Sequence, residues 1–154
     1  DPNFLRTPYD PWVAYARSKT ANVLFAVELE SRHRERGVRA TALHPGGIKT
    51  ELGRHVEDGS LDAMLVQINA ALAAEGRPDY RWKTIPEGAA TSVWAGFVAR
   101  AEDVGGRYCE DCQVAEVTAA DLGPTSPGVR PYALDPANAQ ALWAKSEELV
   151  GENF

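Results

Sequence analysis

Two side chains that can move a proton stand four positions apart near the start of the chain. Tyr15 carries a phenol and Lys19 an ammonium, and residues at this spacing meet on one face of a helix. A cation held beside a phenol favours the phenolate, so a tyrosine, whose ordinary pKa is near ~10, becomes a usable proton donor and acceptor. The spacing therefore predicts proton-transfer chemistry on a helix face.

Residues suited to helix ends flank this pair. Asp10 is a favourable N-cap, Pro11 suits the first helical position, and Gly37 suits the residue after the last turn. The charges of the final turns, within 28–36, have mixed signs, which is typical of a solvated helix end rather than a nucleic-acid surface. We expect one long helix that carries Tyr15 and ends in solvent.

Two segments have the pattern of short strands. Residues 38–43 alternate in part and run into the loop His44-Pro45-Gly46-Gly47, and residues 107–117 follow a Gly-Gly break. Helix followed by strand predicts an α/β domain. Because parallel sheets bury both faces and usually have more strands than two, an absent segment or a partner chain should supply the neighbouring strands.

Three further helices follow from periodicity and capping. One runs from Ser60 to Gly76 with an amphipathic face, and one begins with a Thr84–Glu87 capping box. The last starts at Asp135-Pro136 and ends at Gly151. The apolar positions that we expect to face the core are Ala90, Val93, Trp94, Phe97 and Val98 in the second helix, and Leu142, Trp143 and Leu149 in the third.

Composition excludes several classes of protein. The 154 residues, 44% hydrophobic and 25% charged, suit one globular domain, and a net charge of −6 lacks the basic footprint of a nucleic-acid binder. No apolar run approaches the ~18 residues of a membrane span, and no signal peptide is evident, so we expect a cytoplasmic protein with no membrane partner. Cys109 and Cys112 have no second pair, so we expect no metal and interpret them as structural thiols; a thiol redox protein is an open alternative.

Four motifs together resemble the short-chain dehydrogenase/reductase family. Tyr15 and Lys19 are followed by Thr20-Ala21-Asn22-Val23-Leu24-Phe25, and the strand by His44-Pro45-Gly46 with Thr50. The runs 106–112 and 142–149 are similar to the branch that contains retinol dehydrogenases. This likeness covers most of residues 10–151.

The resemblance implies a fold that is only partly present. Residues 1–154 would form a single partial domain, the C-terminal part of a Rossmann-like doubly wound parallel sheet that lacks the N-terminal dinucleotide-binding strands. The family's Gly-rich pyrophosphate turn, its Asn-Asn-Ala-Gly stretch and its catalytic serine have no counterpart in the sequence. We therefore expect the isolated chain to be inactive.

The resemblance also implies roles for particular residues. Tyr15 would be the general acid/base and would also contact the cofactor, and Lys19 would modulate it and bind the nicotinamide ribose of NADP or NAD. The residues that would meet the nicotinamide carboxamide are Pro45, Gly46, Ile48 and Thr50. The reaction would be hydride transfer that reduces a carbonyl or oxidises an alcohol.

Residues 51–85 lie where the family keeps its variable substrate lid. The residues there that could contact an apolar small-molecule substrate are Leu52, Met64, Leu65 and Trp82. The family commonly forms homo-oligomers, here through the Tyr15 helix or a missing N-terminal segment. The alternative is therefore a non-catalytic remnant or dimerisation module that binds no dinucleotide.

Overall fold

A three-stranded sheet of mixed direction lies at the centre of the computed structural model, which describes residues 1–51, 54, 59–119 and 126–154. Strand β1 (Ala42–His44) pairs in parallel with β2 (Tyr108–Glu110), and β2 pairs antiparallel with β3 (Gln113–Val114). The predicted α/β class and the parallel pairing of the two strand regions are confirmed. Residues 107–117 form two antiparallel strands rather than one, because the chain turns at Asp111 and Cys112, which have positive φ. The first strand is shorter than predicted. The Ala40 carbonyl accepts from the Gly106 N–H, but the Ala40 N–H donates to the Glu30 carboxylate, and regular pairing with β2 begins at Ala42.

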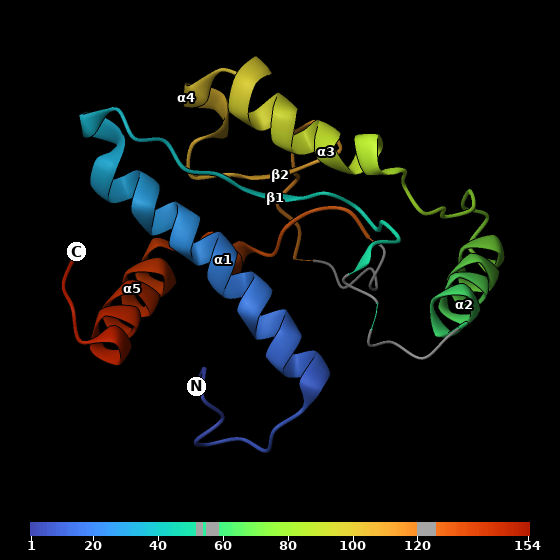
Figure 1. Cartoon of the computed structure of the whole chain (residues 1–154), viewed down its shortest axis with the longest axis horizontal. Helices are drawn as coiled ribbons and strands as arrows, with labels where there is room; N and C mark the ends of the chain where they lie inside the picture. The colour runs from blue at the N-terminus through green and yellow to red at the C-terminus, as the bar shows by residue number, and fades with distance from the viewer. Residues whose placement is uncertain (52–53, 55–58, 120–125) are drawn as a thin grey trace.

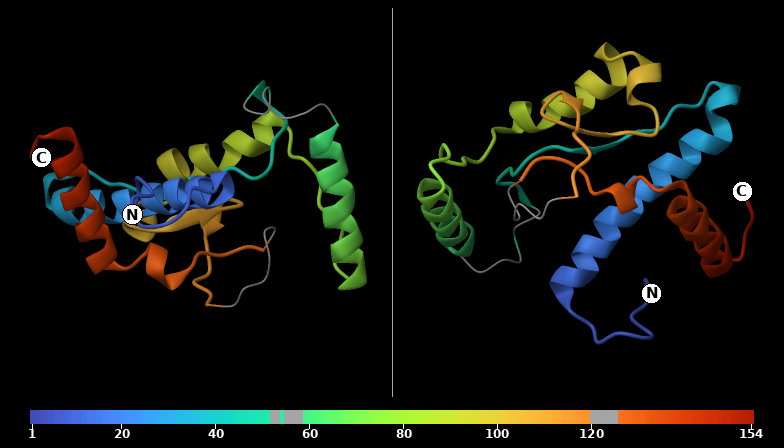
Figure 2. Two further views of the ribbon diagram at one scale, coloured as in Figure 1. Left: turned by 90° about the horizontal axis from the view of Figure 1, so that it is seen from below. Right: turned by 180° about the vertical axis from the view of Figure 1, so that it is seen from behind.

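Helices lie on both sides of the parallel pair. Helix α1 (Pro11–His33) lies on one side with α5 (Pro136–Val150) packed along it, and α3 (Ile85–Val93) lies on the other (Figures 1 and 2). Helix α2 (Ser60–Ala74) stands at one end, away from α1 and α5. The chain thus places one helical layer on each face of β1 and β2.

The predicted ends of α1 are confirmed. The Asp10 carboxylate accepts a hydrogen bond from the Val13 N–H at 2.8 Å, and Pro11 is the first helical residue. The helix ends at His33 and continues as the 3-10 turn η1 (Arg34–Arg36). Gly37 then adopts a φ of +80°, which favours glycine at a helix end.

The predicted solvation of the last turns of α1 is wrong for two carboxylates. Glu28 and Glu30 are only 5% and 7% exposed. Glu28 pairs with Arg32 at 2.7 Å, and Glu30 pairs with Arg39 at 2.7 Å. Because each charge has a partner, this end of the helix can pack against α5 and the start of β1 instead of facing water.

Helix α5 docks on α1 through aromatic rings. The Trp143 ring stacks on Phe25 with centroids 5.3 Å apart, and the Arg32 guanidinium lies 4.7 Å from the Trp143 ring centroid. Trp143 is buried as predicted, whereas Leu149 is exposed, so its predicted inward packing is wrong. Leu149 follows Trp143 by six residues, which places it roughly 120° around the helix axis, on a different face of α5 from the ring stack.

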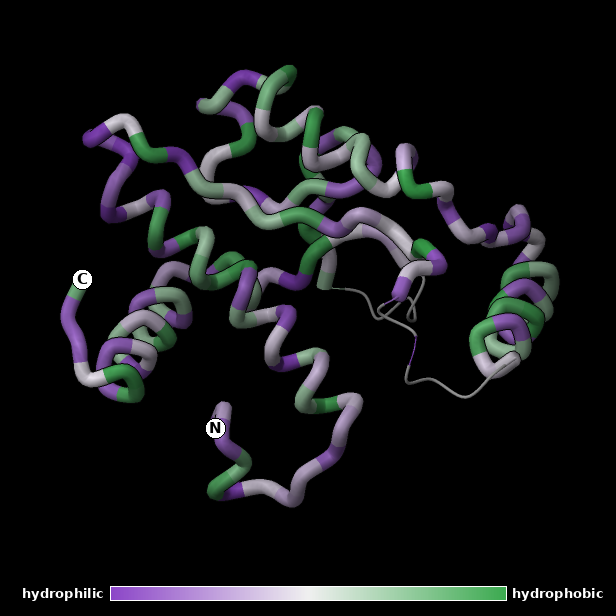
Figure 3. The backbone as a smooth tube through the Cα atoms, viewed as in Figure 1, coloured by the Kyte–Doolittle hydropathy of each residue, from purple (hydrophilic) through white to green (hydrophobic). Residues whose placement is uncertain are grey.

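The helix predicted to begin with the Thr84–Glu87 capping box buries less of its apolar face than expected. The Thr84–Glu87 capping box is present, and α3 continues as the π-helical turn η3 (Trp94–Val98). Of the five residues predicted to face the core, Ala90 and Trp94 are half-buried, whereas Val93, Phe97 and Val98 are exposed, Phe97 by 88%. Figure 3 shows α2 and the α3–η3 helix to be largely hydrophobic in colour. Periodicity indicates which face is apolar, but no part of the chain that the structure describes covers Val93, Phe97 and Val98.

Buried apolar residues join α1 to the segment that follows β3. Val23 of α1 packs with Ala115, Val129 and Ala133, and Tyr108 of β2 packs partly against them. Ala133 belongs to the 3-10 turn η4 (Pro131–Ala133). The short helix α4 (Ala101–Val104) precedes β2 and buries Val104. This small core holds the middle of α1 against the sheet.

The start of α3 should make stability depend on acid pH through Glu87. Its carboxylate accepts hydrogen bonds from Arg81 at 2.6 Å and from the Thr84 N–H at 2.8 Å, and these bonds lower the pKa of Glu87 to about 2. A carboxyl whose pKa falls on folding stabilises the fold above its ordinary pKa, and this contribution is lost as the pH falls towards the folded value. We expect Glu87→Gln to flatten the loss of urea-unfolding stability between pH 4.5 and about 2. Glu152→Gln, an exposed control, should leave that loss unchanged.

Candidate active site

A cleft of about 690 Å³ opens between α1 and the loop that follows β1. Tyr15 and Lys19 line it from α1, and four predicted cofactor-binding residues line it from the loop: Pro45, Gly46, Ile48 and Thr50. The remaining lining residues are Asn22, Val23, Thr41, Ala42, Leu43, His44 and Tyr108. The structure thus brings together all six residues to which the sequence assigns catalysis or cofactor binding.

The helix holds Tyr15 and Lys19 against each other. The Lys19 Nζ lies 5.2 Å from the centroid of the Tyr15 ring, and the side chains stand one turn apart on α1. Tyr15 is 55% exposed at the mouth of the cleft. The arrangement places a cation beside a phenol that an incoming molecule can reach.

One glycine in the loop after β1 and one in α3 leave no room for a side chain where the two segments meet their neighbours. Gly46 has a φ of +89°, and a Cβ there would lie 2.6 Å from the Lys83 Cδ. Ile48 packs onto α3, since a Cβ on Gly88 would lie 2.6 Å from the Ile48 Cδ1. The loop therefore packs against Lys83 and α3 on one side and lines the cleft on the other.

Sequence reasoning missed three polar residues of the cleft. Asn22 stands seven positions after Tyr15, so helical spacing alone puts it on the same face and could have found it. Thr41 precedes β1, and its hydroxyl donates to the Arg107 carbonyl at 2.9 Å. Tyr108 lies opposite Ala42 in the parallel register, which no sequence pattern indicates. Burial, and to a lesser degree Glu110, raises the pKa of Tyr108 to about 12, so this phenol stays protonated.

Of the four residues predicted to contact substrate, the three that the structure describes do not line the cleft. Leu52 lies outside the described residues. Met64 and Leu65 lie on α2, and Trp82 lies in the segment between α2 and α3. The Trp82 indole N–H is buried and has no hydrogen-bond acceptor among the described residues. Contact of these side chains with an apolar substrate stays a prediction.

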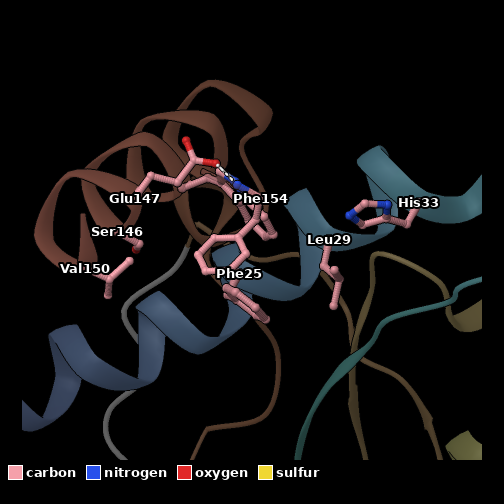
Figure 4. A pocket seen from close by; sticks show the side chains of 8 residues that line it. Phe25, Leu29, His33, Ser146, Glu147, Val150 and Phe154 are labelled. Atoms are coloured by element: carbon pink, nitrogen blue, oxygen red, sulfur yellow. Dashed lines mark hydrogen bonds between the residues drawn. The ribbon is translucent and has the colours of Figure 1, made fainter. Parts of the chain in front are cut away.

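A second hollow, of about 490 Å³, lies between α1 and α5 (Figure 4). It includes His33, Ser146 and Glu147, residue types of a hydrolytic triad, but Figure 4 shows Phe25 and Leu29 between His33 and the other two. The Ser146 hydroxyl donates to the Leu142 carbonyl, and Glu147 accepts from the Trp143 and Phe154 N–H groups at 2.9 Å. These bonds lower the pKa of Glu147 and leave the hollow without a nucleophile–base pair.

The two cysteines occupy different surroundings. Cys109 is fully buried in β2, and burial raises the pKa of its thiol, which disfavours the reactive thiolate. Cys112 is exposed in the β2–β3 turn with a φ of +57°. Both thiols are free, and nothing in their geometry favours a redox pair over structural thiols.

Within residues 1–51, 54, 59–119 and 126–154, no three His, Cys, Asp or Glu side chains gather as a metal site would require. None of the helices in these ranges is long and apolar enough to cross a membrane.

Comparison with known proteins identifies relatives along nearly the whole chain, although no family model matches it. The chain is 44% identical to the "Probable oxidoreductase" of Streptomyces lividans over 93% of its length, which is 46% of that protein. It is 35% identical to the "Short-chain dehydrogenase/reductase prx1" of Penicillium roqueforti over 95% of its length, 40% of that protein. It is 34% identical to the "Retinol dehydrogenase 14" of Homo sapiens over 93% of its length, 37% of that protein.

A solved structure agrees with these relatives. An uncharacterised protein from Mycobacterium paratuberculosis superposes with a TM-score of 0.55 at 30% identity, covering 99% of this chain and 44% of that one. The chain thus spans less than half the length of the proteins that it matches. Within that span, the motifs around Tyr15 and Pro45 and the matches to oxidoreductases agree: the chain belongs to the short-chain dehydrogenase/reductase family.

Proposed function

We propose that this chain is the proton-transfer and nicotinamide side of an NADP(H)- or NAD(H)-dependent oxidoreductase that interconverts a carbonyl and an alcohol. The observation that carries this proposal is that Tyr15 and Lys19 share one cleft with four residues of the loop after β1: Pro45, Gly46, Ile48 and Thr50. Helices on both faces of β1 and β2 support the further reading of the fold as the latter part of a Rossmann-like doubly wound sheet.

The cleft suits the nicotinamide half of such a cofactor. Its volume is within the range of small-molecule sites, and its walls combine apolar side chains with a few polar groups. Lys19 and Asn22 offer donors to ribose hydroxyls, and the peptide groups of Gly46 and Ile48 are at hand for a carboxamide. When bound, the nicotinamide supplies or accepts the hydride.

Tyr15 would give its hydroxyl proton to a carbonyl oxygen, or accept one from an alcohol. Lys19 would stabilise the resulting phenolate. Two unit charges roughly 5 Å apart interact by roughly 0.8 kcal/mol in water and by roughly 3 kcal/mol at an effective dielectric near 20. Tyr15 is half exposed, so water screens its attraction to Lys19. Lys19 would stabilise the phenolate more strongly once substrate and neighbouring segments displace water from the cleft mouth.

Binding of reduced nicotinamide mononucleotide tests this proposal without needing a pyrophosphate site. We expect weak binding, detected by NMR as shifts of the Lys19, Gly46 and Ile48 amides. Lys19→Met should weaken it roughly 10-fold, since a hydrogen bond from a charged donor is lost. Lys145→Met, on the exposed side of α5, is the matched control and should leave the affinity unchanged.

The same titration distinguishes the alternative function. Binding confined to the cleft amides and weakened by Lys19→Met supports the oxidoreductase. Absence of binding, together with a concentration-dependent dimer in sedimentation experiments, would instead support a non-catalytic dimerisation module. The exposed apolar residues Val93, Phe97 and Val98 are the feature that favours an association of that kind.

A further inference from the structure

The loop that lines the cleft is held from behind by residues 80–83, which we call the strap. The Lys83 N–H donates to the Gly47 carbonyl at 2.8 Å, and the Gly47 N–H donates to the Tyr80 hydroxyl at 3.0 Å. Lys83 also forms a parallel bridge with Ile48. Both peptide groups of Gly47 are thus bonded to the strap, one through a backbone group and one through a side chain.

The contact between strap and loop leaves no free space. A Cβ on Gly47 would lie 2.2 Å from the Tyr80 hydroxyl oxygen and 2.9 Å from the Trp82 ring. The Lys83 side chain covers Gly46 and pairs with Asp111 of the β2–β3 turn. The strap is therefore anchored to the sheet as well as to the loop.

Helix α2 fixes the other end of the strap. The Asn69 side-chain carbonyl accepts from the Tyr80 N–H at 2.8 Å, and the Asn69 side-chain NH₂ donates to the Tyr80 carbonyl at 3.1 Å. The Tyr80 ring packs edge-on against Trp82 with centroids 6.0 Å apart. A backbone bonded on both sides and a packed ring give the Tyr80 hydroxyl one fixed position.

Because peptide bonds are planar, the two hydrogen bonds of Gly47 also determine where the Gly46 carbonyl and the Ile48 N–H point. In a trans peptide the C=O and N–H point in opposite directions. A Gly47 N–H bonded to Tyr80 therefore directs the Gly46 carbonyl away from the strap, and a Gly47 carbonyl bonded to Lys83 directs the Ile48 N–H away from it. Gly46 and Ile48 both line the cleft. The Gly46 carbonyl and the Ile48 N–H thus both point away from the strap. Together they offer the one acceptor and one donor that a primary carboxamide requires.

We propose that Tyr80 is a positioning residue that orients the Gly46 carbonyl for the nicotinamide carboxamide by holding the Gly47 N–H. This inference rests on the proposed function and adds a residue outside the cleft to it. Tyr80 acts through the loop and touches neither the cofactor nor the substrate. The Lys83 N–H is a backbone group, so the hydroxyl of Tyr80 is the contact that a side-chain substitution can remove.

Tyr80→Phe removes that hydroxyl and keeps the ring. Hydrogen exchange of the Gly47 amide should accelerate roughly 2- to 10-fold, the value of one hydrogen bond, while the Lys83 amide keeps its rate. The affinity for reduced nicotinamide mononucleotide should fall by a similar factor. The affinity for ribose 5-phosphate, which has no carboxamide, should not change. Tyr132→Phe, at an exposed tyrosine of η4, is the control and should alter none of these quantities.

The outcomes separate this inference from the proposed function. Faster Gly47 exchange with selective loss of nicotinamide affinity supports Tyr80 as a positioning residue. Faster exchange with unchanged affinity, or a parallel loss of ribose 5-phosphate affinity, overturns that role and leaves Tyr80 structural. If the unaltered chain binds ribose 5-phosphate and nicotinamide mononucleotide equally or not at all, the proposed function fails and this inference fails with it.

Discussion

Tyr15→Phe should lower kcat for carbonyl reduction by about 10²- to 10⁴-fold, the usual contribution of a positioned general acid. The substitution deletes the proton and retains the ring against which Lys19 lies at 5.2 Å. Because binding contacts are preserved, KM for the reduced cofactor should change little, and the loss should appear in kcat. The assay is oxidation of NADPH or NADH with a panel of aldehydes and ketones, in the longest natural polypeptide that contains this chain.

Two comparisons make this result specific to Tyr15. Tyr108→Phe alters the other phenol in the cleft, which burial keeps protonated, and should reduce kcat far less. Lys19→Met should lower kcat and raise KM together, since Lys19 serves both the phenolate and the ribose. An unchanged kcat in the Tyr15→Phe variant would show that Tyr15 is not the general acid, whatever the affinity of the variant for the cofactor.

The residues of the candidate site could be predicted because their signals are local. A helix repeats every 3.6 residues, so Tyr15 and Lys19 share a face in any chain that forms this helix, and Asp10 and Pro11 fix where it begins. The loop after β1 follows from its own Pro and Gly residues. Local signals of this kind need no knowledge of what packs where.

The errors concern partners distant in sequence. The burial of Glu30 depends on Arg39 and on the turn before β2, and the exposure of Phe97 depends on whether another segment covers α3. The contact between the strap and the loop could not be predicted from the sequence either, because Tyr80 and Gly47 are 33 residues apart. Periodicity reports which face of an element is apolar or charged, whereas burial is set by the neighbours of that face.

Glu30→Gln should destabilise the fold by about 2–3 kcal/mol, which is less than the cost of about 3–5 kcal/mol for breaking a fully buried ion pair. The Glu30 carboxylate accepts from the Arg39 Nε at 2.7 Å and from the Ala40 N–H at 2.9 Å. The turn before β2 closes over the pair, since a Cβ on Gly105 would lie 2.5 Å from the Glu30 Oε1. Removing the charge leaves the Arg39 guanidinium without its counterion, and the 29% exposure of the Arg39 side chain limits the cost.

A double-mutant cycle in urea unfolding measures this contribution. Glu30→Gln, Arg39→Gln and the double variant should show a favourable coupling, because the double variant no longer holds an uncompensated charge. Glu35→Gln, in the exposed η1 turn, should change the free energy of unfolding by less than about 0.5 kcal/mol. Equal losses from Glu30→Gln and Glu35→Gln would contradict a structural role for the buried pair. Since Glu30 joins the end of α1 to the residue before Thr41, a confirmed coupling also identifies what aligns α1 with β1, and with them the two walls of the cleft.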